Sequence, residues 1–197
     1  RNIIFAKENG VKRFIYPSSC SVYGFSNNNV LLDETARLKP KSTYAKAQSE
    51  LEKFAVKQGD SDFCITVLRL PTVFGKSKRT RFDVIINALV YDVLEKKKLT
   101  LLRNGKQKRP FVHVKDVARA FVFFAKKNKK LINNQIYNVG DETNNINLIS
   151  LANKIFDKTK VKKNISWYGN SDDRSYFVSF KKIKKIGFTS KYNIDYG

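Results

Sequence analysis

The sequence predicts an α/β protein built on a parallel β-sheet, and three observations support this prediction. Apolar runs of strand length, of the kind found in buried parallel strands, lie at residues 11–16 and 63–70, and a further strand of the same sheet is expected at residues 135–139. A helix-like segment separates the two runs, which indicates a strand–helix–strand unit with a right-handed crossover. Short strands at 99–102 and 165–168 alternate with further amphipathic segments. We expect these two strands in a smaller, second α/β domain.

The length and composition set the frame for this prediction. With 197 residues, of which 42% are hydrophobic, the chain is long enough for one domain or one and a half with a sizeable core. It contains no Met, and its first ten residues look like the second half of a helix that ends at Gly10. We therefore expect the sequence to be a fragment that lacks its N-terminal part.

The net charge of +22 first suggests a nucleic-acid partner or an anionic surface. The lysines are scattered, however, and their clusters fall at expected helix ends and solvent-facing positions, where they complement the helix dipole. The abundance of Lys, Asn and Ile is also what an AT-rich genome would impose. We expect no specific nucleic-acid binding, although a nucleic-acid binder stays open as a third hypothesis.

The cysteines and the single histidine indicate which compartment to expect and whether a metal site is present. Cys20 and Cys64 both lie in apolar, strand-like runs, which favours reduced thiols in a cytoplasmic protein. No apolar run approaches the length of about 18 residues that a membrane span needs. His113 is the single histidine, lies between two valines and is interpreted as structural, so no metal site is expected.

The segment at residues 42–55 is the helix around which the chemistry is expected. Pro40 stops an earlier helix, and Ser42 or Thr43 can cap the start. Apolar side chains at helical spacing predict the buried stripe, namely Ala47, Leu51, Phe54 and Ala55. Tyr44 falls in the first turn, with Gln48 one turn later on the same face.

The remaining elements alternate along the chain. Strand 11–16 ends in a small, hydroxyl-rich stretch at 17–24, and strand 63–70 ends at Pro71. Another extended piece is expected at 109–114. Helices are expected at residues 82–95, 115–127, 146–158 and 180–186.

Read together, these segments resemble the extended short-chain dehydrogenase/reductase family, whose members are mostly sugar-nucleotide epimerases, dehydratases and decarboxylases. The matching segments are residues 11–24 (VKRFIYPSSCSVYG), 44–48 (YAKAQ), 68–75 (LRLPTVFG), 109–120 (RPFVHVKDVARA), 137–140 (YNVG), 173–176 (DRSY) and 183–188 (IKKIGF). They cover nearly the whole chain in order, and their joint pattern is specific.

The resemblance implies a Rossmann-like, doubly wound parallel sheet whose first strands are missing here, with a smaller α/β substrate-binding domain. Residues 1–75 and 107–140 would form the C-terminal part of the NAD-binding domain, and residues 76–106 and 141–197 the substrate-binding domain. The glycine-rich loop that holds the NAD pyrophosphate is expected upstream of Arg1. The resemblance also implies a nucleotide-sugar substrate and a homodimer.

In the family, a Tyr removes the proton of a sugar hydroxyl, assisted by a Lys four residues later that favours the phenolate and binds the nicotinamide ribose. Tyr44 matches the Tyr, but Gln48 stands at the Lys position and carries no charge. Ser19 matches the hydroxyl that hydrogen-bonds the substrate oxygen. Catalytic roles are therefore expected for Ser19, Tyr44 and Gln48. Cofactor contacts are expected from Ser18, Tyr44, Gln48, Leu70 and Pro71.

The residues after Ser19 narrow the expected reaction. Dehydratases and decarboxylases of the family carry acids there, whereas this chain has Cys20 and Ser21, which favours epimerisation or simple oxidoreduction. Substrate contacts are expected from Ser19, Thr72, Arg81, Arg109 and Arg174, because Arg suits a diphosphate. The alternative is a catalytically impaired or non-catalytic relative that binds dinucleotide or nucleotide sugar, motivated by Gln48.

Overall fold

The structure, a computed structural model, describes residues 1–26, 30–102, 104–170 and 175–197. Its main sheet consists of three parallel strands in the order β1-β3-β7, namely β1 (Arg13–Ser19), β3 (Cys64–Leu70) and β7 (Gln135–Asn138). The prediction that these three strands join one parallel sheet is confirmed. The register places Ser19 beside Leu70, so that β1 and β3 end at the same edge of the sheet.

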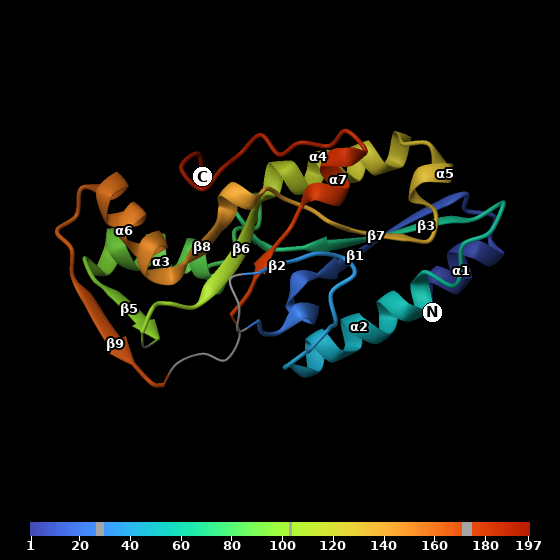
Figure 1. The fold of residues 1–197 in the computed structure, drawn as a ribbon. Helices are drawn as coiled ribbons and strands as arrows, with labels where there is room; N and C mark the ends of the chain where they lie inside the picture. Colours follow the sequence, from blue (N-terminus) through green and yellow to red (C-terminus); the bar gives the residue numbers. More distant parts are fainter. Residues whose placement is uncertain (27–29, 103, 171–174) are drawn as a thin grey trace.

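Helices cover both faces of this sheet (Figure 1). α1 (Asn2–Glu8) and α2 (Thr43–Ala55) lie on one face, and α4 (Val114–Lys126), α5 (Lys129–Ile132) and α7 (Lys181–Lys185) on the other. Because α2 is the crossover between the parallel strands β1 and β3, it runs antiparallel to them. Its first turn, with Tyr44, therefore lies at the edge where β1 and β3 end.

A second group of elements surrounds a separate apolar cluster. The strands β5 (Leu99–Leu102) and β9 (Ile165–Tyr168) form a parallel pair outside the main sheet, as expected. The helices α3 (Ile85–Lys96) and α6 (Leu148–Thr159) pack on each other beside this pair (Figure 1). The helix expected at 82–95 is present, but it begins only at Ile85, because Val84 at the N-cap has extended backbone.

A third sheet connects the two groups. It has the order β4-β6-β8, with β4 (Thr72–Phe74), β6 (Lys108–His113) and β8 (Asn145–Asn147). β6 is parallel to β4 and antiparallel to β8, so one strand touches both parts of the molecule. The helix expected from residue 146 begins at Leu148, because the Asn147 side chain caps it by accepting from the Ser150 N–H at 2.8 Å. The division into two domains stays a prediction.

Short elements complete the chain. β2 (Leu31–Leu32) and β10 (Phe177–Val178) form a two-residue parallel pair, and η1 (Cys20–Tyr23) and η2 (Glu142–Asn144) are 3₁₀ turns. Cys20 therefore begins a 3₁₀ turn, which corrects the expectation of a strand, whereas Cys64 begins β3. Both cysteines are buried free thiols.

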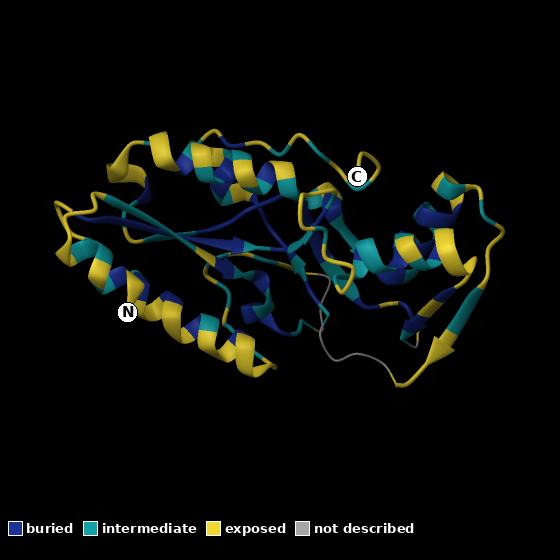
Figure 2. Cartoon of the chain, turned by 180° about the vertical axis from the view of Figure 1, so that it is seen from behind, coloured by how far each residue is buried: buried dark blue, intermediate teal, exposed yellow. Residues whose placement is uncertain are grey.

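The buried side of α2 differs from the predicted stripe. The ring of Phe54 and the side chain of Leu51 are 40% and 41% exposed, and Ala47 is exposed as well. The buried positions are Ala45, Ser49, Glu52 and Ala55. Small side chains let α2 approach β1 closely, and Glu52 is drawn inwards by its buried partner Arg69 at 2.7 Å. Figure 2 shows the exposed residues along the outward side of α2.

Candidate functional site

Two cavities lie where the carboxyl ends of β1 and β3 meet the second group of elements. The first, which we call the tyrosine cavity, has a volume of about 570 Å³. It brings together seven of the residues singled out in the sequence, namely Ser18, Ser19, Tyr44, Leu70, Pro71, Thr72 and Arg81. This is the edge at which open parallel sheets commonly bind their ligands.

Tyr44 enters the tyrosine cavity from the first turn of α2. The Ser42 hydroxyl caps the helix by accepting from the Ala45 N–H at 3.1 Å, which fixes the position of this turn. The Tyr44 side chain is 57% exposed, so its hydroxyl is accessible to a ligand. Arg81 lines the same cavity and is paired with Asp83, its Nε lying 3.0 Å from Oδ1. The hydrogen bond to Asp83 raises the pKa of Arg81, and the neighbouring Tyr44 adds to the effect.

The two serines at the end of β1 differ in their surroundings. The Ser19 Oγ accepts from the Ser21 N–H at 3.2 Å, which leaves the Ser19 hydroxyl proton available to a ligand. Ser18 is buried, and its hydroxyl donates to the Glu52 carboxylate beneath the cavity. The Ser18 hydroxyl is thus engaged within the protein, although Ser18 is among the residues that line the tyrosine cavity.

Gln48 is half-buried and is not among the described residues that line either cavity. Its Oε1 accepts a hydrogen bond from the Tyr16 hydroxyl at 2.7 Å, across from α2 to β1. The structure therefore groups Tyr44 with Ser19 but places Gln48 one turn further along α2, beside Tyr16.

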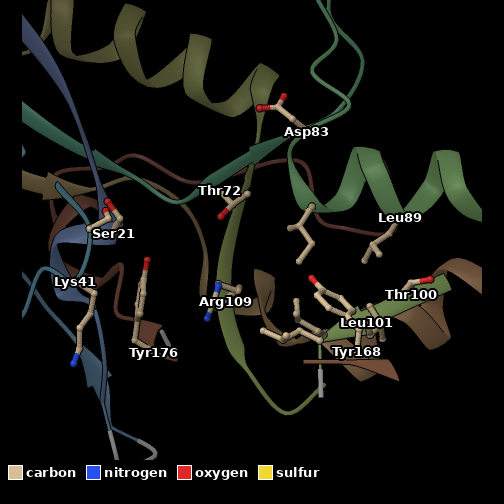
Figure 3. Close-up of a pocket in the computed structure, with 15 residues that line it drawn as sticks. Ser21, Lys41, Thr72, Asp83, Leu89, Thr100, Leu101, Arg109, Tyr168 and Tyr176 are labelled. Atoms are coloured by element: carbon tan, nitrogen blue, oxygen red, sulfur yellow. The ribbon is translucent and has the colours of Figure 1, made fainter. Parts of the chain in front are cut away.

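The second cavity, of about 460 Å³, extends from the tyrosine cavity towards α3 and β5 (Figure 3). Thr72 borders both cavities, which are therefore adjacent. One end carries Ser21, Lys41 and Tyr176, and the other carries apolar and aromatic side chains, including Leu89, Leu101 and Tyr168. Arg109 of β6 stands between the two ends.

This arrangement suits a long ligand with three chemically different parts. The apolar end can hold a flat ring, the Arg109 guanidinium can meet an anionic centre, and the end with Ser21, Lys41 and Tyr176 offers polar groups. We call this hollow the elongated cavity. Arg174, the remaining candidate, lies outside the described residues.

Comparison with known proteins decides the family. The profile of the NAD-dependent epimerase/dehydratase family matches residues 3–140, which is well over half of the chain. The chain belongs to this family. The resemblance of the sequence motifs to the extended short-chain dehydrogenases/reductases is thereby confirmed.

Each alignment with a relative includes a larger share of this chain than of the relative. A dTDP-D-glucose 4,6-dehydratase of Mus musculus is 26% identical over 196 residues, which is 94% of this chain and 53% of that protein. A UDP-glucose epimerase of Bacillus subtilis, itself uncharacterised, is 31% identical over 114 residues, 57% of this chain and 35% of its own length. The chain thus spans at most about half the length of these relatives.

Solved structures agree with the fold. A UDP-glucose 4-epimerase of Thermotoga maritima, solved with UDP-glucose, superposes with a TM-score of 0.87 at 22% identity, over 99% of this chain and 63% of that one. A UDP-glucuronic acid 4-epimerase of Bacillus cereus, solved with UDP-glucuronic acid and NAD, gives 0.84 at 20% identity, over 98% and 61%. The expected Rossmann-like α/β fold is confirmed.

A buried polar network that the sequence did not reveal lies beneath the tyrosine cavity and connects β3 to α2. Arg69 of β3 pairs with Glu52 of α2, and its Nη1 donates to the Tyr23 hydroxyl at 2.9 Å. The Tyr23 hydroxyl in turn donates to Asn138 Oδ1 at 2.9 Å. Burial raises the pKa of Tyr23 well above its ordinary value. The available sequence signal was an Arg inside an otherwise apolar strand, which requires a buried partner.

Ser21 is a further residue of the candidate site that the sequence did not reveal. Its Oγ is buried, has no hydrogen-bond partner among the described residues, and borders the elongated cavity. A buried hydroxyl without a partner costs free energy unless a ligand supplies one. Its position two residues after Ser19 was the signal that could have found it.

Two further observations concern metal binding and membrane insertion. In the described ranges, no three His, Cys, Asp or Glu side chains gather in a way that could hold a metal ion. No helix within the described part of the chain has both the length and the apolar character needed to cross a membrane.

His113 is buried and caps α4, its Nδ1 accepting from the Lys115 N–H at 3.2 Å, so its role is structural.

Proposed function

We propose that the protein carrying this chain is an NAD-dependent epimerase or oxidoreductase that acts on a nucleotide sugar, with Tyr44 as acid/base and Ser19 as hydrogen-bond partner. The observation that supports this proposal most directly is that the two cavities are adjacent, since Thr72 borders both. A ligand in the elongated cavity would therefore lie next to the cavity that Ser19 and Tyr44 line.

The chain's own groups suit the proton half of such a reaction. The accessible Tyr44 hydroxyl, as phenolate, takes the proton of a sugar hydroxyl, and the Ser19 hydroxyl holds the same oxygen by hydrogen bonding. Bound NAD would supply the hydride acceptor for the sugar carbon. The cavity fits this partner, because Leu70 and Pro71 offer a wall for a flat ring beside Tyr44.

The elongated cavity would hold the substrate. Arg109 is placed to meet the diphosphate, and the apolar end to meet the base, while Ser21 and Thr72 supply hydroxyl groups for the sugar. Arg81 lines the tyrosine cavity. If it binds the substrate, it would therefore contact the sugar end. The residues after Ser19 are not acids, which favours epimerisation or oxidoreduction over elimination and decarboxylation.

A second candidate, a non-catalytic module that binds dinucleotide or nucleotide sugar, is favoured by Gln48. The expected Lys is absent, and Gln48 is engaged with Tyr16. The experiment that separates the two is turnover of a panel of UDP- and dTDP-sugars by the full-length protein, together with NAD titration. Conversion that Tyr44→Phe and Ser19→Ala abolish supports the enzyme. NAD binding without conversion supports the module, and binding of neither contradicts both.

We further propose a cytoplasmic homodimer. Leu51 and Phe54 of α2 are exposed apolar side chains, and they would form part of the surface that a second copy covers. The buried free thiols Cys20 and Cys64 suit a reducing compartment. Light scattering of the full-length protein tests the dimer, and Leu51→Glu should convert it to a monomer. A wild-type monomer contradicts it.

A further inference from the structure

Two lysine-rich connections lie side by side at the end of the molecule that points away from the main sheet (Figure 1). One runs from the last turn of α3 to the start of β5, over residues 92–98, and the other runs from the end of α6 towards β9, over residues 157–163. The Leu99 N–H donates to the Asn164 carbonyl oxygen at 2.9 Å, which holds the two connections together. We call this surface the lysine end. Its lysines are all exposed, namely Lys96, Lys97, Lys98, Lys158, Lys160, Lys162 and Lys163.

The lysine end carries more positive charge than the chain as a whole. Seven of its 14 residues are Lys, whereas Lys and Arg together account for 39 of all 197 residues. Three of its residues are acidic, and one of them, Asp92, pairs with Lys96 at 2.7 Å. The Lys97 ammonium contacts the Leu94 carbonyl oxygen. The side chains of the other five lysines form no hydrogen bond or ion pair with any described residue, so their charges face solvent.

The backbone that follows α3 and α6 gives a second indication that these side chains matter. Lys97 and Lys160 come directly after the two helices and have φ values of 53° and 57°, in the left-handed region. Gly takes this conformation at the least cost, and Asn is the usual alternative. Asn134 occupies the other described non-glycine position of this kind. Two lysines at positions that favour Gly therefore point to a use for their charge.

A shallow hollow of about 620 Å³ lies between the two connections. It is lined by Lys97, Val161, Lys162, Lys163 and Asn164. Lysines in the last turn of a helix complement its dipole, but this effect does not extend beyond the terminal turn. Lys162 and Lys163 follow the end of α6 at Thr159, so the helix dipole does not account for them. The hollow thus collects three lysines around a space that an anionic group can enter.

We propose that the lysine end docks on the surface of a membrane that is rich in anionic lipids. Clusters of about four to eight basic residues bind such surfaces through the lipid headgroups. A lysine is a point charge on a flexible stem, which suits headgroups that move. Leu94, which is 46% exposed, and Val161 lie among the charges, where an apolar side chain can reach the acyl boundary. Such a contact is peripheral and needs no spanning helix.

A nucleic acid is a less suitable partner for this surface. Single strands are held by aromatic side chains on which the bases stack, and guanine in a duplex is read most often by the fork of an Arg. Among the described residues that line the hollow there is neither an aromatic side chain nor an Arg. The exposed Leu94 has no favourable place against a phosphate backbone, whereas it suits a lipid surface. The observations therefore favour the membrane.

The position of the lysine end leaves the candidate site free. β5 and β9 both start at the lysine end, and their last residues, Leu102 and Tyr168, line the elongated cavity. A strand of this length spans about 10–13 Å. The lysine end and the elongated cavity thus lie at opposite ends of the strand pair, so docking on a membrane does not cover the cavity.

Sedimentation of the full-length protein with lipid vesicles tests the proposal. The protein should bind vesicles of phosphatidylcholine with about 30% phosphatidylserine at about 0.1 M salt, and should not bind vesicles of phosphatidylcholine alone. The triple variant Lys98→Gln, Lys162→Gln, Lys163→Gln should bind the anionic vesicles about a hundredfold more weakly, because each lysine near such a surface contributes about fivefold. Salt at about 0.5 M should release the parent protein, a readout that needs no variant.

The matched control removes the same charge from exposed lysines around the main sheet. The side chains of these lysines form no hydrogen bond or ion pair with any described residue, and the substitutions are Lys12→Gln, Lys126→Gln and Lys130→Gln. The control should change vesicle binding less than about threefold, because charges far from the membrane are screened by salt. Thermal melting shows that both triple variants are folded.

Four results would overturn the proposal. These are failure of the parent to bind the anionic vesicles, equal binding to both kinds of vesicle, binding that persists at the higher salt, and equal effects of the lysine-end variant and the control. Competition with DNA adds a further test. Duplex or single-stranded DNA that removes the protein from the vesicles at an equal concentration of phosphate would assign the surface to nucleic acid instead. None of these measurements uses turnover, so their outcome is independent of the proposed function.

Discussion

Arg69 Nη2 lies 2.7 Å from Glu52 Oε2, and the two side chains are only 3% and 1% exposed. This ion pair joins the helix that carries Tyr44 to the central strand of the main sheet. The Arg69 Nε also lies 3.1 Å from both Glu52 oxygens, so the carboxylate is contacted by two nitrogens of the guanidinium. Glu52 also accepts from Ser18, which ties the end of β1 to the same carboxylate.

Removal of one partner should therefore be costly. Arg69→Met leaves the Glu52 carboxylate buried without its cation, and we expect a loss of about 3–5 kcal/mol in the free energy of unfolding. The exposed pair Lys53–Glu50 on the same helix, 2.8 Å apart, is the matched control. Lys53→Met should cost less than about 1 kcal/mol. Urea denaturation measures both values, and equal losses would contradict the buried-pair argument.

His113 should make stability depend on pH. Burial lowers its pKa below the ordinary 6.5, the nearby Lys115 adds to this, and Asp116 opposes it. The unfolded chain therefore binds a proton more readily than the folded one, so stability is fully present above pH 6.5 and falls as the pH drops through 6.5 towards the folded pKa. Each unit of depression corresponds to about 1.4 kcal/mol.

His113→Asn tests this dependence, because Asn can still cap α4 but does not titrate. The drop in the free energy of unfolding between pH 7.5 and 5.5 should be smaller in the variant than in the parent. An identical drop in both proteins would assign it to other groups.

The sequence predicts the parallel sheet because β1 and β3 are rich in apolar side chains and a helix of crossover length lies between them. The buried side of α2 is harder to predict, because hydrophobicity favours Leu51 and Phe54 while the fold buries Ser49 and Glu52. A buried carboxylate is stable only with its partner Arg69, which is 17 residues away in the sequence. Periodicity within one helix does not contain that partner.

The candidate site shows the same limit. Residues next to recognisable motifs, such as Ser19, Tyr44 and Thr72, could be named from the sequence, although their roles stay predictions. Tyr16 and Lys41 could not be named, because each reaches its place only through strand register or the path of a loop. The Tyr16–Gln48 contact spans 32 residues and has no signature in either local segment.

Gln48→Lys should change the dependence of turnover on pH. An ammonium one turn after Tyr44 favours the phenolate. A pKa lower by one unit corresponds to about 1.4 kcal/mol and raises the phenolate fraction at neutral pH about tenfold. Turnover of a nucleotide sugar by the full-length protein should rise accordingly and its pH profile should move to lower pH, with Tyr44→Phe abolishing both changes. The lysine also gives up the acceptor that Tyr16 uses, so the Tyr16 hydroxyl must turn to accept from the ammonium, which its lone pairs allow. If the variant binds NAD yet stays as inert as the parent towards the nucleotide sugars, the missing charge is not what limits the protein, and the non-catalytic module is the better description.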